Sequence, residues 1–381
     1  MNHVAMVIPG LDRLGGAERQ LLLLAHGLSR RRWKVSVVAL SGSGGGARQL
    51  SLDAGADFYC LEMRKGLVDP RGWLRFHHWM RESAPQIVHA HLPHAVWMAR
   101  WSRLAAPVRV VLDTLHSSST GGRARRLGYR WSDWLTDQST AVSQAAADAH
   151  RCAGMTTKLQ VLPNGIDTGI FHPDATVRAQ LRSELQLGEE FLWIAAGRME
   201  AVKDYPTMLR AMAQLPDRAR LVVAGSGPME GEIKVLCEQL GLNARVHFVG
   251  FDPEVQRWMQ AADGFVLASR WEGLPLGLLE AAACGLPGVA TDVPGSREAV
   301  IAGETGLLAT ANNVQALAQA MNQLMQMAPA ERKAMGDKAR EMVLERFGIE
   351  AVLDRWESLY EQLLACNTSP KRVSGRAIVR R

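Results

Sequence analysis

Two glutamates spaced eight residues apart stand in the segment of this chain that is richest in residues able to do chemistry. Glu272 precedes a Gly-Leu-Pro loop, and Glu280 falls within a pattern typical of a helix. A helix beginning at Pro275 presents free backbone N–H groups and the positive end of its dipole, which favour a bound phosphate. A phosphate there would lie between the carboxylates, so the carboxylates are left to bind hydroxyls. A nucleotide sugar offers ribose hydroxyls for one glutamate, hexose hydroxyls for the other and a diphosphate for the helix start. The alternative is one glutamate that stabilises the helix dipole and one that is solvated.

Two cations follow a predicted buried strand in the same half of the chain. The apolar run FLWIAAG, which begins at Phe191, ends next to Arg198, and Lys203 follows five residues later. Ligands of open α/β sheets bind at the carboxyl ends of the strands. Fixed cations at that position can stabilise the charge that builds up on a departing diphosphate. Two solvated surface cations are the alternative.

Two glycine-rich turns receive different interpretations. Gly15 and Gly16 open a predicted helix, where glycine lets a backbone N–H approach a phosphate oxygen closely. The turn Gly225-Ser226-Gly227 lacks the full dinucleotide-binding fingerprint, and we interpret it as a tight structural connection.

Three histidines stand on two predicted strands of the first half. His116 ends one strand, and His89 and His91 lie on another. A histidine at a strand end can contact a sugar hydroxyl, although a hydrogen-bonded structural role is the more common one. We predict a functional role only for His116.

Parallel sheets are predicted to position these residues. With 381 residues and 47% hydrophobic content, the chain is long enough for two domains. Short apolar runs alternate with helix-like stretches in both halves, which predicts an α/β fold class with two Rossmann-like domains. The strands are expected at 3–9, 33–40, 86–92 and 108–116, near 141 and 161, and from 191, 221, 245, 264 and 287.

A segment rich in Pro, Gly, Asn and Asp, residues 162–174, is predicted to be the hinge between the domains. The predicted boundaries are a first domain at 1–165, a second at 166–345, a C-terminal helix at 346–365 and a disordered basic tail at 366–381.

The net charge of +6 is unevenly distributed along the chain. Residues 1–165 carry 21 Lys or Arg and 11 Asp or Glu, whereas residues 166–365 carry 18 and 27. The basic first half includes a stretch in which cations alternate with aromatic side chains: Arg123, Arg125, Arg126, Tyr129, Arg130, Trp131 and Trp134. Such a stretch could contact an anionic membrane surface. The alternative is a solvated helix with a buried aromatic face.

Several other classes of protein are disfavoured by the composition. Five scattered cysteines show no spacing typical of zinc or of a disulfide framework, and no Asp-x-Asp cluster suggests a metal. No apolar run is long enough to span a membrane, and the N-terminus lacks a signal-peptide pattern, so we expect a cytoplasmic protein. No aromatic platform or recognised motif supports nucleic-acid binding, and neither domain opens with the NAD fingerprint.

Five short motifs, in this order and spacing, resemble family 4 retaining glycosyltransferases. They are GGAER at 15–19, TLH at 114–116, NGID at 164–167, GRMEAVKDY at 197–205 and EGLPLGLLEA at 272–281. The resemblance extends from residue 3 to about residue 365 and implies a GT-B fold. In that fold two Rossmann-like domains hold the donor in a cleft, and a C-terminal helix crosses back to the first domain.

The resemblance also implies roles for individual residues. Arg198 and Lys203 match the diphosphate-binding pair, and Glu280 matches the ribose ligand. The other matches are the sugar-binding loop of Glu272, Gly273, Leu274 and Pro275, the phosphate-contacting Gly16, His116 near the transferred sugar, and Val249 and Gly250 near the base. The expected catalytic residues are Glu272, His116, Arg198 and Lys203.

The expected reaction is the transfer of a hexose or N-acetylhexosamine, with retention of configuration and with neither metal nor cofactor. We favour UDP over GDP in the donor, and a lipid-linked glycan of surface-polysaccharide assembly as the acceptor, reached at the inner face of the membrane. A soluble sugar or glucan acceptor, or a non-catalytic nucleotide-sugar binding protein, are the alternatives. The sequence does not specify the oligomeric state.

Overall fold

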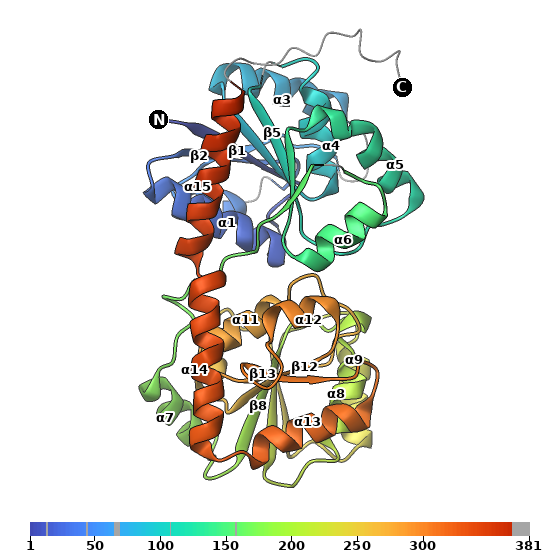
Figure 1. The fold of residues 1–381 in the computed structure, drawn as a ribbon, viewed down its shortest axis with the longest axis vertical. Helices are drawn as coiled ribbons and strands as arrows, with labels where there is room; N and C mark the ends of the chain where they lie inside the picture. The colour runs from blue at the N-terminus through green and yellow to red at the C-terminus, as the bar shows by residue number, and fades with distance from the viewer. Residues whose placement is uncertain (13, 43–44, 65–68, 107, 157, 368–381) are drawn as a thin grey trace. The chain divides into compact units, whose positions relative to one another are not determined.

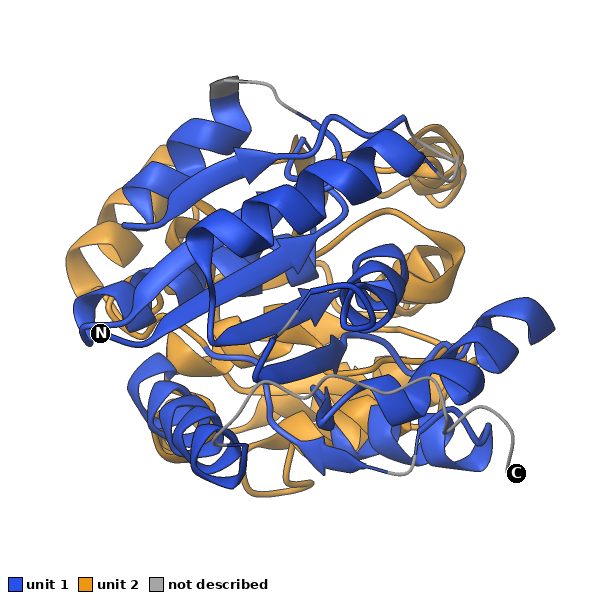
Figure 2. Cartoon of the chain, turned by 90° about the horizontal axis from the view of Figure 1, so that it is seen from above, with its two compact units in different colours: residues 1–165, 349–381 blue, residues 166–348 orange. Residues whose placement is uncertain are grey.

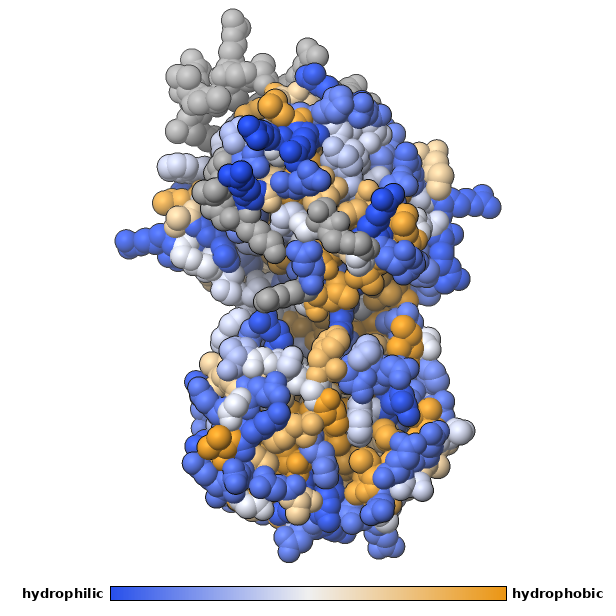
Figure 3. All heavy atoms as spheres, turned by 180° about the vertical axis from the view of Figure 1, so that it is seen from behind, coloured by the Kyte–Doolittle hydropathy of each residue, from blue (hydrophilic) through white to orange (hydrophobic). Residues whose placement is uncertain are grey.

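A computed structural model of the chain describes all residues except 13, 43–44, 65–68, 107, 157 and 368–381. The chain divides into two compact units (Figures 1 and 2). Unit 1 comprises residues 1–165 together with 349–381, and unit 2 comprises residues 166–348. On the face shown in Figure 3, the surface is mostly hydrophilic, with smaller apolar patches between the polar side chains.

Unit 1 is built on a seven-stranded sheet in the order β3-β2-β1-β4-β5-β6-β7, and every strand pair in it is parallel. The strands are β1 His3–Ile8, β2 Lys34–Ala39, β3 Asp57–Cys60, β4 Ile87–His91, β5 Val110–Leu115, β6 Gln138–Ala141 and β7 Leu159–Val161. Its helices are α1 Gly16–Arg30, α2 Gly45–Asp53, α3 Pro70–Ser83, α4 Pro93–Ser102, α5 Arg123–Ser132, α6 Gln144–Cys152 and α15 Ile349–Cys366, with a 3₁₀ turn at Asp133–Leu135.

The alternation of side chains along β1 shows why this sheet is covered on both faces. Val4, Met6 and Ile8 pack into one apolar cluster, and Ala5 and Val7 pack into another on the opposite face. The first cluster also contains side chains of α1 and α15, which lie side by side (Figure 1). The C-terminal helix is therefore part of the core of unit 1.

Unit 2 has a six-stranded parallel sheet in the order β10-β9-β8-β11-β12-β13. The strands are β8 Phe191–Ala196, β9 Ala219–Ala224, β10 Val246–Gly250, β11 Gly264–Leu267, β12 Gly288–Thr291 and β13 Gly306–Ala309. Its helices are α7 Ala175–Glu184, α8 Tyr205–Met212, α9 Glu230–Gln239, α10 Val255–Ala261, α11 Leu276–Ala283, α12 Pro294–Ala299, α13 Val314–Gln326 and α14 Pro329–Arg346, with a 3₁₀ turn, η2, at Ala201–Lys203.

The predicted α/β fold is confirmed, and the structure adds elements that the apolar pattern did not predict. The short strands β3 and β13 are both additions. The predicted helix at 346–365 begins only at Ile349, because α14 ends at Arg346 and the backbone bends at Phe347 and Gly348. The Phe347 carbonyl accepts a hydrogen bond of 2.7 Å from the N–H of Ile166, a contact that a continuous helix would not allow. The predicted tail lies outside the described residues from 368 onward.

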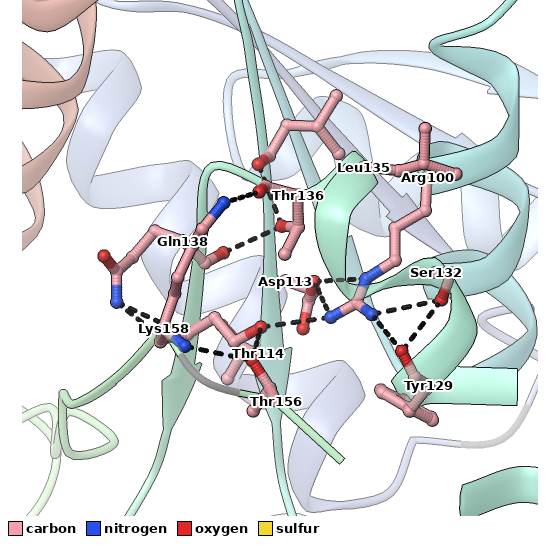
Figure 4. A network of polar contacts seen from close by, with 12 residues as sticks. Arg100, Asp113, Thr114, Tyr129, Ser132, Leu135, Thr136, Gln138, Thr156 and Lys158 are labelled. Carbon is pink, nitrogen blue, oxygen red and sulfur yellow. Dashed lines mark hydrogen bonds and ion pairs between the residues drawn. The ribbon is translucent and has the colours of Figure 1, made fainter. Parts of the chain in front are cut away.

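A buried ion pair fixes the basic helix α5 to the sheet of unit 1 (Figure 4). Arg100, on α4, contacts Asp113 of β5 at 2.8 Å, and both side chains are fully buried. The same guanidinium donates to the Tyr129 carbonyl and to the Ser132 hydroxyl on α5, both at 3.1 Å. The hydrogen bonds that satisfy the buried charge therefore also position α5.

No helix among the described residues is long and apolar enough to cross a membrane.

Candidate active site

The strand order of unit 2 reverses between β8 and β11. The chain runs outward from β8 to β9 and β10, and then returns to the other side of β8 as β11. In open parallel sheets the loops that leave two such strands diverge, and ligands bind in the crevice at their carboxyl ends. The loop after β8 carries Arg198 and Lys203, and the loop after β11 carries Glu272.

An ion pair joins these two loops at the strand reversal. The Lys203 Nζ lies 2.6 Å from Oε1 of Glu272, and the Ser269 hydroxyl donates to the same oxygen, also at 2.6 Å. The side chains of Lys203 and Glu272 keep 22% and 10% of their exposure. The pair is thus mostly enclosed and still reachable by a ligand.

Asp204 helps to hold the two loops together. It adopts the left-handed conformation at the end of η2, with φ of 47°, and its side chain is buried. The carboxylate accepts a hydrogen bond of 2.9 Å from Thr207 and lies 3.3 Å from the Arg270 guanidinium. The Arg270 N–H also bonds to the Val202 carbonyl at 2.8 Å. These contacts explain how residues 69 positions apart keep a fixed distance.

Tyr205 contacts the backbone of the loop after β8. Its hydroxyl donates to the Gly197 carbonyl at 2.9 Å. Burial raises the pKa of this phenol, and the nearby Glu272 carboxylate raises it further, so Tyr205 stays protonated and remains a donor.

Arg198 differs from Lys203 in exposure. Its side chain is 69% exposed and lies 3.1 Å from the Glu200 carboxylate. An exposed ion pair of this kind contributes little to stability, so Arg198 can exchange its partner for a ligand at small cost.

The loop from Gly273 to Pro275 leads directly into α11. Leu274 is buried, and Pro275 is the residue before the helix, which begins at Leu276 rather than at Pro275 as predicted. The Leu278 N–H already donates to the Pro275 carbonyl at 3.1 Å, so the N–H groups of Leu276 and Gly277 at the start of α11 are the ones left for the proposed phosphate. Glu280 lies on the second turn of α11 and is partly buried.

Val249 and Gly250 end β10, the edge strand of the sheet next to β9, where the register with β9 shifts by a β-bulge. Gly250 has φ of 71°, and its carbonyl accepts a hydrogen bond of 2.6 Å from the N–H of Gly225. A Cβ at Gly225 would lie 2.0 Å from the Gly197 carbonyl oxygen. This close backbone contact fits the structural interpretation of the Gly225–Gly227 turn.

Gly16 and His116 belong to unit 1, whereas the other predicted site residues belong to unit 2. Gly16 begins α1, and the Gly15 N–H that precedes it bonds to the Glu18 carboxylate at 3.0 Å. One of the amides at this helix end is therefore engaged within the chain.

His116 directly follows β5 and is paired with a second histidine. Its Nε2 lies 2.9 Å from Nδ1 of His91, the last residue of β4. His89 lies two residues earlier, with Nδ1 2.7 Å from the Tyr360 hydroxyl and Nε2 2.7 Å from the Thr114 hydroxyl. Burial lowers the pKa of His116 to about 4 and lowers those of His89 and His91 well below the usual value. All three rings are therefore neutral at pH 7.

A small cavity of about 20 Å³ adjoins the histidine pair. It lies between α1, the carboxyl ends of β4 and β5, the segment 162–165 and α15. The residues that line it are Gln20, Leu24, His91, Thr114, His116, Leu162, Pro163, Asn164, Gly165, Ile349, Val352 and Trp356.

The two parallel α/β units form a GT-B fold, and comparisons with known proteins identify the family. Residues 14–169 match the model of Glycosyltransferase Family 4, and residues 177–342 match that of glycosyl transferases group 1. The chain belongs to this family, as the sequence motifs predicted.

Curated relatives agree with the assignment. The GDP-mannose-dependent alpha-(1-6)-phosphatidylinositol monomannoside mannosyltransferase of Mycobacterium tuberculosis is 31% identical over 70% of this chain and 71% of its own length. The lipopolysaccharide core biosynthesis mannosyltransferase LpsB of Rhizobium meliloti is also 31% identical, over 71% of this chain and 80% of its length.

Solved structures share the fold at lower identity. Anabaena HepE, crystallised with UDP, superposes with a TM-score of 0.81 at 21% identity, covering 95% of this chain and all of HepE. A glycosyltransferase from Rickettsia africae gives a TM-score of 0.84 at 17% identity, covering 95% and 98%.

Sequence reasoning missed several residues that the structure places at the site. The Ser269 hydroxyl contacts Glu272, and the Tyr205 hydroxyl contacts the Gly197 carbonyl in the loop that carries Arg198. His91 contacts His116. One signal was available for Ser269, because it follows β11 by two positions and so had to lie at the same sheet edge as Glu272.

Proposed function

We propose that this glycosyltransferase transfers a hexose or N-acetylhexosamine from a nucleoside-diphosphate sugar, with UDP favoured over GDP, to a lipid-linked glycan in surface-polysaccharide assembly. The reaction proceeds with retention of configuration and without a metal. The observation that carries the proposal is the Lys203–Glu272 ion pair at the strand reversal of unit 2, beside the start of α11.

The ion pair has the chemistry that a nucleotide sugar needs. An arriving diphosphate offers Lys203 a stronger partner than one carboxylate oxygen, and Arg198 adds a second cation. Glu272, released from Lys203, can then accept a hydrogen bond from a sugar hydroxyl. Cations fixed in this way stabilise the negative charge of the departing diphosphate.

The relatives support the class of donor and acceptor without agreeing on the base. HepE was crystallised with UDP, whereas the mycobacterial relative uses GDP-mannose and acts on a phosphatidylinositol glycolipid. LpsB acts in lipopolysaccharide core synthesis. These names support an acceptor that is attached to lipid.

A surface on α5 and the following turn supports membrane contact. Leu127, Trp131 and Trp134 are spaced to share one helix face, and all three are exposed, Trp131 by 69%. The alternative of a buried aromatic face is wrong for both tryptophans, because only Tyr129 of this stretch is buried in the core. The exposed Arg123, Arg125 and Arg130 flank these residues on α5.

Apolar and basic side chains together fit an anionic bilayer surface, where each cation contributes about 1 kcal/mol. Sedimentation with anionic and neutral vesicles at low salt tests this contact. We expect binding to anionic vesicles that Trp131→Ser weakens and that Trp271→Ser, at a tryptophan of unit 2 that is 48% exposed, leaves unchanged. Absence of binding by the unaltered protein would leave the soluble-acceptor alternative.

The donor is tested by the thermal stability of the protein with saturating UDP, GDP, ADP and CMP. A ligand at a hundred times its dissociation constant adds about 2.7 kcal/mol to the folded state. We expect UDP to stabilise most and Lys203→Ala to remove the effect, while Lys234→Ala, in an exposed ion pair of α9, keeps it. A larger thermal stabilisation by GDP than by UDP would show that the base of the donor is guanine and not uracil.

The non-catalytic alternative is separated from an enzyme by turnover. A binding protein would be stabilised by the same nucleotides and would produce no glycosylated product from any donor and acceptor offered to it.

A further inference from the structure

Nε2 of His91 and Nδ1 of His116 are two of the four buried ring nitrogens of unit 1 that have no hydrogen-bond partner among the described residues. The other two, Nε2 of His77 and Nε1 of Trp97, belong to residues that do not line the small cavity. The remaining nitrogen of the His91 ring faces that of the His116 ring at 2.9 Å, and both rings line this cavity. A buried polar atom without a partner costs about 1–3 kcal/mol, so unpartnered nitrogens in rings that line a cavity indicate a place for polar ligand groups.

The hydrogen bond between the rings couples the two free nitrogens. Each neutral imidazole has one N–H donor and one acceptor nitrogen. If His91 donates from Nδ1, its Nε2 is an acceptor and His116 presents an Nδ1–H donor. If His116 donates from Nε2, its Nδ1 is an acceptor and His91 presents an Nε2–H donor. In both states the pair offers one donor and one acceptor.

The two rings meet end to end through their shared hydrogen bond, with ring centroids 5.2 Å apart, so the two outer nitrogens lie on opposite sides of the pair and point away from each other. One ligand group therefore cannot bond to both, and each nitrogen needs a partner of its own. The rings carry no charge, which favours uncharged polar partners such as hydroxyl groups over ions, unlike the charged site of unit 2.

We propose that His91 is a positioning residue that fixes the tautomer and the orientation of His116, whose free Nδ1 binds a hydroxyl group of a substrate. That the hydroxyl belongs to a sugar rests on the proposed function. His89, on the same strand, serves as the structural contrast, because its two nitrogens are both bonded within the chain.

Nitrogen-15 NMR of histidine-labelled protein tests the pair directly, since the two ring nitrogens report which of them carries the proton. The His116 signals are identified by their loss in His116→Gln. In His91→Leu we expect these signals to move toward an average of the two tautomers. In His91→Asn they should stay near their original positions, because the asparagine amide reaches as far as Nδ1 of histidine.

His3→Asn is the matched control. His3 is buried at the start of β1, and both its nitrogens are bonded, to the Ser83 carbonyl and the Ser36 hydroxyl. It should lower stability and leave the His116 signals unchanged. Unchanged His116 signals in a folded His91→Leu would overturn the pairing.

Kinetics test the role in transfer. We expect kcat/KM of His91→Leu to fall about tenfold, the size of one lost hydrogen bond, with partial recovery in His91→Asn. The dissociation constant for the nucleoside diphosphate should stay within about twofold, because its predicted cationic ligands lie in unit 2. Unaltered kcat/KM in His91→Leu would overturn the positioning role. If the unaltered protein transfers no sugar, the proposed function fails, whereas the NMR result still decides whether the pair exists.

Discussion

The carboxyl edges of the two parallel sheets have a similar strand architecture, but the candidate site residues are charged at one edge and neutral at the other. In unit 2, the loops after β8 and β11 present Lys203 and Glu272 as a partly exposed ion pair, with Arg198 exposed nearby in sequence. In unit 1, the ends of β4 and β5 present neutral imidazoles, that of His91 buried and that of His116 half-buried. The difference fits the proposed functions, in which the edge of unit 2 binds a charged diphosphate and the edge of unit 1 binds an uncharged hydroxyl.

The two units also use ion pairs differently. Arg100 and Asp113 are fully buried and their hydrogen bonds join α4, α5 and β5, whereas the Lys203–Glu272 pair keeps some exposure and belongs to the proposed donor site. A buried pair is costly to break, while an accessible pair can exchange partners.

Breaking the Arg100–Asp113 pair is expected to have the largest effect on stability. Arg100→Met leaves the Asp113 carboxylate buried without its counterion, which costs about 3–5 kcal/mol of unfolding free energy. Denaturant unfolding measures the loss. Lys203→Met should change the same quantity by less than about 1 kcal/mol. Similar losses in both variants would show that the two pairs do not differ in role.

Removing the carboxylate of unit 2 is expected to affect transfer rather than stability. Glu272→Ala should lower kcat by about 10²–10³-fold, because it removes a hydrogen-bond acceptor and the partner that orients Lys203. Steady-state kinetics with the donor found in the thermal screen measures the effect. The matched control is Glu254→Ala, in an exposed ion pair of unit 2. Wild-type turnover in Glu272→Ala would remove this residue from the site.

Acid should destabilise unit 1 before unit 2. Burial lowers the pKa of His116 to about 4, so between pH 6.5 and 4 the unfolded chain binds a proton that the folded chain does not. Stability therefore falls as the pH falls through this window, by about 3 kcal/mol for His116 alone. The pKa is also lowered for His3, His77, His89, His91 and His150 of unit 1.

Hydrogen exchange followed by mass spectrometry at pH 6.5 and pH 5 measures this difference, after correction for the intrinsic exchange rate. Peptides covering β4 and β5 should lose protection, and peptides covering β8 and β11 should keep it. Equal loss in both units would contradict the assignment of the acid-sensitive groups to unit 1.

The smallest of these effects is expected at Arg198. Its side chain is exposed, so Arg198→Ala should weaken nucleoside-diphosphate binding by about tenfold without changing stability. Calorimetric titration measures the dissociation constant. Arg257→Ala, which removes another exposed arginine of unit 2, is the control. Equal affinity in both variants would place the diphosphate on Lys203 and α11 alone.

The sequence predicted which strand ends carry the candidate ligands. Lys203 and Glu272 each follow an apolar run, and parallel strands bring their carboxyl ends to one edge. The pattern did not predict that the two side chains contact each other, or that Ser269 shares the same oxygen of Glu272. These contacts depend on the left-handed turn at Asp204, a conformation that the apolar pattern does not reveal.

The apolar periodicity also failed to predict a break between two helices and the exposure of one aromatic side chain. The pattern after residue 330 is helical throughout, and it gave no signal for the bend at Phe347, which depends on a hydrogen bond to Ile166. The exposure of Trp131 was equally hidden, because α5 is oriented by the side chain of Arg100 on a different helix.

By itself the sequence determined the α/β class, the family, and the residues that reach the strand edges, because buried parallel strands and short ligand motifs are local features of the chain. Only the tertiary structure decided the partners of those residues. Lys203 meets Glu272 and His91 meets His116 because strands distant in sequence lie adjacent in the sheets. Burial then makes one pair of side chains neutral, and residual exposure keeps the other pair charged and accessible.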